Sequence, residues 1–222
     1  MKRGLFITFE GVDGVGKTTQ ADNLADYLTQ PTSLQDYLDV KRPPVLLTRE
    51  PGGTPLGESL HRLLLDPSSP RIGKRAEALL YAAARAQHVA EIIRPALEHN
   101  ETVVCDRYTD STIAYQVGGR GLDEGDVERL NEWTTGGLQP DRTYLLDMEP
   151  KDRRLVGDVD RLEGESIEFQ NRVRQTFLNL AEQYPDRILV VDASQSMEKV
   201  WATIKTDVDR ILAQRASAER LA

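Results

Sequence analysis

The chain carries the pattern G-x-x-x-x-G-K-[ST] at Gly11-Val12-Asp13-Gly14-Val15-Gly16-Lys17-Thr18, between a short apolar segment and a helical pattern. Glycines let successive backbone N–H groups surround phosphate oxygens, and the N-terminus of the following helix adds positive potential. Lys17 supplies a point charge, and the hydroxyl of Thr18 can coordinate Mg²⁺. A glycine-rich turn with a solvated lysine is the alternative. The setting between a strand and a helix favours a loop that binds the phosphates of a nucleoside triphosphate.

Short apolar runs alternate with longer helical patterns along the rest of the chain. We expect β-strands at residues 5–9, 45–48, 102–105, 143–146 and 188–191. Four of them are nearly continuous apolar runs, which is typical of strands buried on both faces of a parallel sheet. The helical patterns cover residues 18–29, 56–65, 74–99, 126–135, 166–184 and 196–215. This alternation predicts an α/β protein with a doubly wound, five-stranded parallel sheet flanked by helices.

Length and composition narrow the possibilities further. At ~150 residues per domain, a chain of 222 residues favours one domain spanning residues 1–222. The 36 acidic and 28 basic side chains give a net charge of −8, which argues against a nucleic-acid-binding surface. The longest apolar run, residues 78–84, is far shorter than the ~20 residues that span a bilayer. Since Cys105 is the only cysteine, we expect a reduced, cytoplasmic protein without membrane contact.

Two segments fit no regular element. Residues 30–44 contain three prolines, and we expect a surface excursion there, more in keeping with a lineage-specific loop than with a functional insert. Residues 150–161, with the sequence PKDRRLVGDVDR, are strongly charged and contain Gly157. This second segment is predicted to be a short mobile lid rather than part of the core.

Several residues beyond the loop indicate a second substrate. Asp106 and Arg107 close the third predicted strand, at the sheet edge where ligands of open α/β proteins bind. Asp106 can hold Thr18 or the water shell of a metal, and Arg107 can bind a phosphate; a purely structural ion pair is the alternative. Tyr81 and Arg85 are four residues apart in a helical pattern, so they share a face suited to stacking on a base and bonding its edge. A buried tyrosine beside an arginine that reaches solvent is the alternative there.

Together these motifs resemble those of the thymidylate kinase family, in the family's order and over essentially the whole chain. The resemblance rests on residues 9–19, 48–54, 106–108, 111–116, 118–121, 160–163 and 192–194. It implies a P-loop kinase fold that transfers the γ-phosphoryl of ATP to dTMP, giving dTDP and ADP, with Mg²⁺ bound. It also implies a homodimer formed through helices. The apolar surface of residues 78–84 could form that contact, or it could be core against the sheet.

The resemblance assigns roles to individual residues. The residues expected to hold ATP are Gly11, Val12, Asp13, Gly14, Val15, Gly16, Lys17, Thr18 and Thr19, with Ala193 near the adenine. Mg²⁺ is expected near Thr18 and Asp106. The residues expected to bind dTMP are Asp13, Glu50, Tyr81, Arg85, Arg107, Thr112, Tyr115 and Gln116.

Within the dTMP set the implied tasks differ. Tyr81 would stack on thymine where the family usually has phenylalanine, and Arg85 would bond the base edge. Thr112 and Gln116 would read the pyrimidine, and Tyr115 would pack against the deoxyribose. Arg107 would bind the 5′-phosphate. It would also share the catalytic work with Lys17.

The loop positions Val12 to Val15 include no arginine, which resembles the bacterial type of the family, in which lid arginines reach the transferring phosphoryl group. Arg153 and Arg154 are the catalytic candidates, and a solvated charged turn is the alternative. Two other functions stay open from the residues alone. One is a P-loop kinase for a nucleoside or another nucleoside monophosphate; the other is a P-loop switch that hydrolyses a nucleotide and binds a partner.

Overall fold

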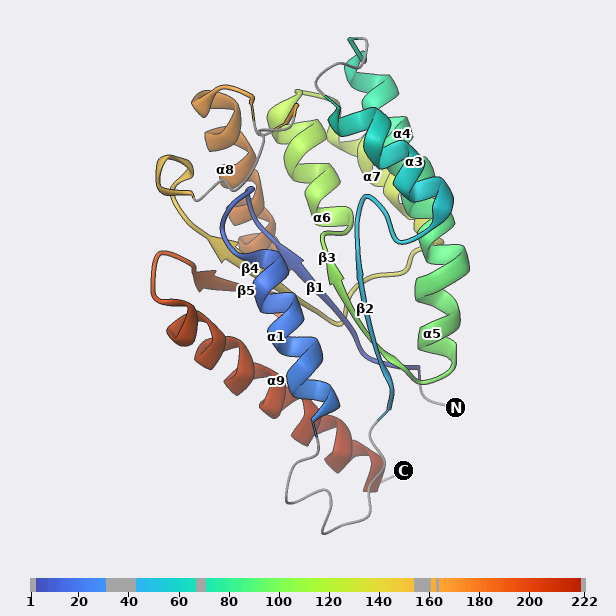
Figure 1. Ribbon diagram of the computed structural model, residues 1–222, viewed down its shortest axis with the longest axis vertical. Coiled ribbons are helices and arrows are strands. Elements are labelled where there is room, and N and C mark those ends of the chain that lie inside the picture. Colours follow the sequence, from blue (N-terminus) through green and yellow to red (C-terminus); the bar gives the residue numbers. More distant parts are fainter. Residues whose placement is uncertain (1–2, 31–42, 67–70, 154–160, 163, 221–222) are drawn as a thin grey trace.

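The computed structural model describes residues 3–30, 43–66, 71–153, 161–162 and 164–220. Five parallel strands form one sheet in the order β2-β3-β1-β4-β5 (Figure 1). Their bounds are Phe6–Glu10 for β1, Val45–Arg49 for β2, Thr102–Asp106 for β3, Arg142–Asp147 for β4 and Ile188–Asp192 for β5. All five predicted strands are confirmed, and each one extends one residue further, to a charged side chain.

Helices cover both faces of the sheet, which confirms the doubly wound α/β prediction (Figure 1). On one face α1 (Lys17–Thr29) contacts the three strands β1, β2 and β3, and α9 (Met197–Arg220) packs against β5. On the other face lie α5 (Arg94–Glu98) and α8 (Ile167–Gln183). The helices α3 (Pro55–Leu65), α4 (Lys74–His88) and α7 (Glu124–Thr135) form a neighbouring layer in which α4 contacts the other two.

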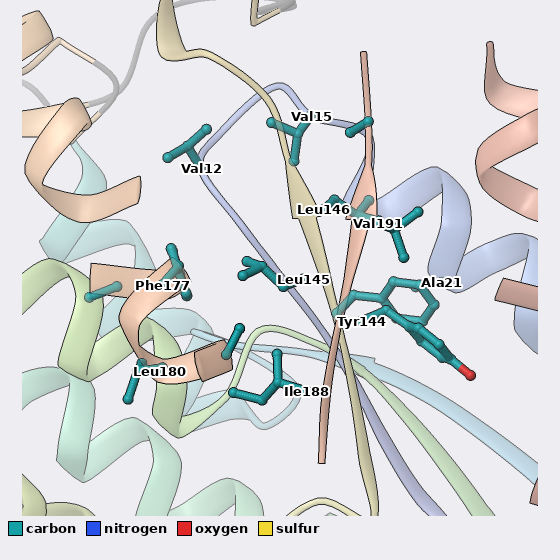
Figure 2. Packing of buried hydrophobic residues seen from close by; sticks show 14 of the residues in the cluster. Val12, Val15, Ala21, Tyr144, Leu145, Leu146, Phe177, Leu180, Ile188 and Val191 are labelled. Carbon is teal, nitrogen blue, oxygen red and sulfur yellow. The ribbon is translucent and has the colours of Figure 1, made fainter. Parts of the chain in front are cut away.

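The core lies around the central strand β1, whose five residues are all buried. The Phe9 ring packs against the Tyr144 ring of β4 at a centroid distance of 5.4 Å. Between the sheet and α8, Phe177 and Leu180 meet Leu145 in the same cluster (Figure 2). Because β1 is held from both faces, the loop that follows it starts from a fixed point. No helix among the described residues is long and apolar enough to cross a bilayer.

The predicted helix at residues 74–99 is helical throughout but changes geometry in the middle. A π-helical segment, Val89–Ile93, separates α4 from α5. Pro95 stands at the start of α5 and has no N–H to donate to the preceding turn, so the widened turn absorbs the missing bond. The Gln30–Pro44 excursion and the 150–161 lid fall largely outside the described residues; Pro150–Asp152 form a short 3₁₀ turn.

Sequence patterns missed the helical segment after β3. It consists of α6 (Thr109–Thr112) and a π-helical stretch, Ile113–Gly119, rich in β-branched residues and glycine that have low helix propensity. Tertiary packing against α8 overrides that propensity. A Cβ at Gly119 would lie 2.5 Å from the ring of Phe169 on α8, so only glycine lets the two helices approach this closely.

We therefore expect Gly119→Ala to destabilise the fold by about 1–3 kcal/mol, because the added methyl group must displace Phe169. Chemical denaturation measures the change. The matched control is Gly125→Ala in the first turn of α7, where the nearest atoms are the ends of flexible side chains. Alanine there should stabilise by up to about 1 kcal/mol through helix propensity. Equal effects of the two substitutions would contradict the packing explanation.

Candidate active site

The predicted phosphate loop connects β1 to α1 at the carboxyl edge of the sheet. Gly11 has a φ of 134°, and a Cβ there would lie 2.4 Å from the Leu146 carbonyl oxygen, so no side chain fits. Gly16 caps α1 in the left-handed region, at a φ of 95°. Lys17 is buried at the first position of the helix, with Nζ donating to the Val12 carbonyl at 2.8 Å. The backbone curvature is that of a phosphate-binding loop.

The Lys17 ammonium is held away from water. Burial lowers its pKa, the Arg107 charge lowers it further, and the carboxylates of Asp13 and Asp106 offset part of the effect, which leaves a pKa of about 8. An anion placed beside Nζ favours the charged form. The loop therefore gains electrostatic energy when a polyphosphate binds.

The metal candidates Thr18 and Asp106 contact each other directly. Thr18 Oγ1 donates to Asp106 Oδ2 at 2.6 Å, as the sequence predicted. Asp106 Oδ1 is buried and has no hydrogen-bond partner among the described residues. Hydroxyl and carboxylate oxygens are the ligands that Mg²⁺ prefers, usually with phosphate oxygens and water completing the shell. No group of three or more His, Cys, Asp or Glu side chains that could hold a metal occurs in the described part.

Arg107 lies directly after β3 and joins the loop to the second substrate region. Its φ of 72° is rare for a residue with a side chain, and its backbone N–H donates to the Phe9 carbonyl at 2.9 Å. The guanidinium donates to the Gly11 carbonyl and to Ser111 Oγ, each at 3.0 Å, and pairs with Asp13. The unusual backbone therefore aims a cation between two parts of the site.

Asp13 accepts hydrogen bonds from Arg107 and from the Tyr115 hydroxyl, the latter at 2.8 Å. Burial alone would raise the pKa of Asp13, but the charges of Arg107 and Lys17 together with these bonds lower it to about 2. The carboxylate is therefore ionised at neutral pH. It fixes the position of Arg107 and of the Tyr115 ring.

A buried carboxyl group, that of Glu10, binds the residues that follow Arg107. Glu10 is fully buried at the end of β1 and accepts bonds from the Tyr108 N–H at 2.7 Å and from Ser111 Oγ at 2.5 Å. Burial and the nearby Asp110 raise its pKa to about 7, against the lowering effect of Arg107. The sequence motifs assign no role to Glu10, although a charged residue that ends an apolar strand is a signal of one.

Two cavities meet at this edge. The first has a volume of about 610 Å³ and is lined by the predicted ATP residues 13–19 and Ala193. The second, narrower cavity is lined by all eight predicted acceptor residues: Asp13, Glu50, Tyr81, Arg85, Arg107, Thr112, Tyr115 and Gln116. Asp13 and Arg107 line both. Two anionic ligands placed in these cavities would face each other at the Arg107 guanidinium.

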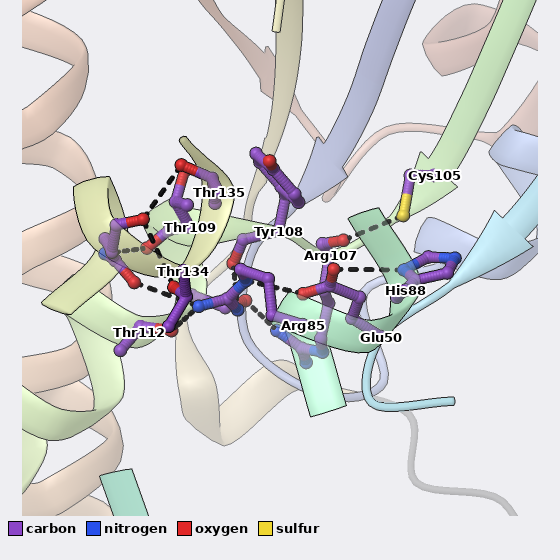
Figure 3. A network of polar contacts seen from close by, with 12 residues as sticks. Glu50, Arg85, His88, Cys105, Arg107, Tyr108, Thr109, Thr112, Thr134 and Thr135 are labelled. Carbon is purple, nitrogen blue, oxygen red and sulfur yellow. Dashed lines mark hydrogen bonds and ion pairs between the residues drawn. The ribbon is translucent and has the colours of Figure 1, made fainter. Parts of the chain in front are cut away.

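Arg85 is fixed at the end of the narrower cavity, and Figure 3 shows its network. Its Nε donates to Glu50 Oε2 at 2.7 Å and its Nη1 to Thr112 Oγ1 at 2.6 Å; Asn131 and the Tyr108 carbonyl accept further bonds. The alternative of an arginine that reaches solvent is wrong, since Arg85 is 3% exposed. Glu50 also binds His88 Nδ1 at 3.0 Å, so one carboxylate anchors the arginine to a buried histidine.

Of the two arginines predicted to act from the lid, the structure describes only Arg153. Arg154 lies outside the described residues. Arg153 ends the 3₁₀ turn after β4 and is not among the residues that line the two cavities, so its catalytic role stays a prediction. Two further residues line the cavities without a role predicted from the motifs. Arg49 lines the larger cavity and pairs with Glu58, and Leu162 lines the narrower one.

The fold and the two cavities define a P-loop nucleotide-binding protein with room for a second substrate. Residues 9–204 match the sequence family described as thymidylate kinase. A thymidylate kinase from Bifidobacterium longum (strain DJO10A) is 52% identical over 94% of this chain and 98% of its own length. A thymidylate kinase from Cutibacterium acnes is 48% identical over 94% of this chain and 98% of its own length.

A solved structure gives the same result. The crystal structure of thymidylate kinase from Ehrlichia chaffeensis superposes with a TM-score of 0.72 at 35% identity, covering 93% of this chain and 99% of that one. The chain belongs to the thymidylate kinase family. The resemblance predicted from the motifs is confirmed.

The raised pKa of Glu10 predicts a dependence of stability on pH. The folded state favours the neutral carboxyl. The stability that this preference adds is therefore fully present below pH 4.5 and is lost as the pH rises towards 7. We expect this group to lower the free energy of unfolding by about 3 kcal/mol across that window. Urea denaturation measures the free energy of unfolding at pH 5 and at pH 7.5. Between these pH values it should fall less for Glu10→Gln than for the wild type.

The matched control for this measurement is Glu124→Gln, which removes an exposed carboxylate from the first turn of α7. The free energy of unfolding of Glu124→Gln should fall between the two pH values by the same amount as that of the wild type. If Glu10→Gln and the wild type lose equal amounts, Glu10 is not the group that titrates.

Proposed function

We propose that this chain transfers the γ-phosphoryl group of ATP to dTMP, producing dTDP and ADP. The observation that carries the proposal is the meeting of the two cavities at Asp13 and Arg107. Membership of the thymidylate kinase family favours this function over another nucleoside monophosphate kinase and over a nucleotide switch. A switch needs only the larger cavity.

The reaction needs little help with protons. A 5′-phosphate oxygen of the acceptor is already ionised near pH 7, so no general base is required. The barrier is lowered by aligning donor and acceptor and by placing cations near the charge spread over the transferring group. Lys17 and Arg107 can supply two of these cations, and their hydrogen bonds to Val12, Gly11 and Ser111 fix both in place before the substrates arrive.

We infer that Mg²⁺ accompanies ATP, held through Thr18 Oγ1 and through Asp106 directly or by way of a water molecule. The ion would neutralise charge on the phosphates. Support comes from the buried Oδ1 of Asp106, which has no hydrogen-bond partner among the described residues. We also propose that the chain is one kinase domain working in the cytoplasm, with Arg153 or Arg154 of the lid as a further cation.

Phosphoryl transfer from ATP across a panel of nucleoside monophosphates tests the proposed function. We expect dTMP to be the best acceptor and dUMP to be ~10–200-fold poorer in kcat/KM, the range that one missing methyl group in an apolar pocket produces. Pro51, Leu65 and Leu162 supply apolar surface in the narrower cavity. ATP turnover that is independent of any acceptor would contradict the proposal and favour the switch.

The same assay includes Lys17→Met, for which we expect kcat to fall on the order of 10²–10³-fold, as when one electrostatic donor to a transition state is removed. Lys205→Met on α9 is the matched control. It removes a lysine that pairs with Asp209 and lies outside both cavities, so activity should be retained. Near-native turnover by Lys17→Met would overturn the assignment of the loop.

We further propose that the protein is a homodimer. Large apolar side chains are exposed on the neighbouring helices α3, α4 and α7, namely Leu56, Leu63, Leu79 and Trp133. Within residues 78–84, Ala78, Ala82 and Ala84 are buried, whereas Leu79 is 58% exposed and open to contact with a second copy. A second copy would bury this apolar surface around a two-fold axis.

Sedimentation velocity at micromolar concentration measures the oligomeric state. Leu79→Lys should convert the dimer to a monomer, because a two-fold interface would bury both new charges. The matched control is Ile167→Lys at the start of α8, a similarly exposed apolar position outside the three helices, which should remain dimeric. A wild-type monomer would refute the dimer.

A further inference from the structure

Glu77 on α4 is a buried carboxylate that no part of the proposed reaction uses. It is 1% exposed and lies one helical turn before Tyr81. Its Oε1 accepts from Gln116 Nε2 at 3.1 Å and from Arg120 Nε at 3.0 Å, and its Oε2 pairs with Arg161 Nη2 at 2.7 Å. Burial alone would raise the pKa of Glu77, but the bonds and charges of Arg120 and Arg161 lower it below the ordinary value. Glu77 is therefore an ionised acceptor.

An ionised carboxylate dictates how the neighbouring amide of Gln116 is turned. A carboxylate can only accept hydrogen bonds, so Gln116 must present its nitrogen to Glu77, and its carbonyl oxygen must point the other way. No hydrogen bond among the described residues occupies Gln116 Oε1, and Gln116 lines the narrower cavity, whereas Glu77 does not. The amide therefore offers an acceptor to whatever base enters.

An acceptor at this position distinguishes the pyrimidines. N3 of thymine carries a hydrogen and donates, whereas N3 of cytosine accepts. The same cavity holds Arg85, whose hydrogen bonds to protein acceptors leave one Nη2–H, a donor that suits the O4 acceptor of thymine and opposes the exocyclic amino group of cytosine. With cytosine bound, the Gln116 oxygen would face N3, another acceptor. Neither atom would form a hydrogen bond, although both would have been removed from water, so cytosine would bind less well.

We propose that Glu77 is a positioning residue that sets pyrimidine selectivity: it fixes the Gln116 amide so that Oε1 faces N3 and cytosine is rejected. The inference rests on the proposed acceptor, a pyrimidine nucleoside monophosphate. Arg120 and Arg161 serve the same end, because they keep Glu77 charged and in place.

The test compares kcat/KM for dTMP and dCMP in the wild type, Glu77→Gln, Gln116→Leu and the double variant. A glutamine at position 77 offers both a donor and an acceptor, so either orientation of Gln116 becomes possible. We expect the dTMP-to-dCMP ratio of Glu77→Gln to fall by at least about tenfold, the equivalent of ~1.4 kcal/mol. In the Gln116→Leu background the same change should alter the ratio by less than about twofold, because no amide is left to orient.

Two controls separate this role from a structural one. Glu165→Gln removes the other carboxylate partner of Arg120 but leaves the bond from Gln116 to Glu77, so the ratio should stay at the wild-type value. Glu77→Asp keeps an acceptor-only group and should retain most of the selectivity. Glu77→Gln leaves Arg120 and Arg161 facing a neutral partner, which could prevent folding. In that case the dTMP-to-dCMP ratio is measured in the variant that combines Glu77→Gln with Arg120→Gln.

The outcomes are distinct. An equal loss of activity towards both nucleotides, or an effect of Glu77→Gln that persists without the Gln116 amide, would overturn the proposal. A wild-type enzyme that phosphorylates neither nucleotide would instead refute the proposed function.

Discussion

The ion pair between Arg107 and Asp13 holds the two halves of the site together. Asp13 belongs to the loop after β1, Arg107 to the turn after β3, and both line both cavities. The neighbouring strands β1 and β3 pair in parallel, so their carboxyl ends bring the two side chains to one edge. The pair therefore fixes a cation and an anion at the place where the two cavities meet.

Buried carboxylates hold the groups that face the ligands. Glu10 binds the turn that carries Arg107, Glu50 binds Arg85, and Glu77 binds the amide of Gln116. Glu50 and Glu77 accept bonds from cationic partners, which offset the cost of burying their charges and lower their pKa values, whereas burial raises the pKa of Glu10. A binding site for two anions can therefore exist in a chain with a net charge of −8, because its cations are local and their partners are internal.

Most of the fold could be predicted from the sequence, because strands buried on both faces leave continuous apolar runs. The predicted strands stopped where the apolar residues stopped, one residue before Glu10, Arg49, Asp106, Asp147 and Asp192. Those charged ends belong to the sheet because the parallel pairing continues to them, with Arg49 opposite Asp106 and Asp147 opposite Asp192. The helical segment at residues 109–119 was missed for a related reason: its close packing on α8 through Gly119 is a tertiary effect that propensity does not encode.

The site was predictable to the same depth. Residues expected to touch ligands occur in short motifs or at helical spacing, so the eight residues from Asp13 to Gln116 that line the narrower cavity could be listed from the sequence. Residues that position them could not, since Glu77 lies 39 positions from Gln116 and shares no motif with it. A ligand contact fixes the residue type at one place, whereas a supporting contact needs only an acceptor at the right point in space. The proposed selectivity therefore depends on Glu77, a side chain of α4 that no sequence motif reveals and that acts through its hydrogen bond to Gln116.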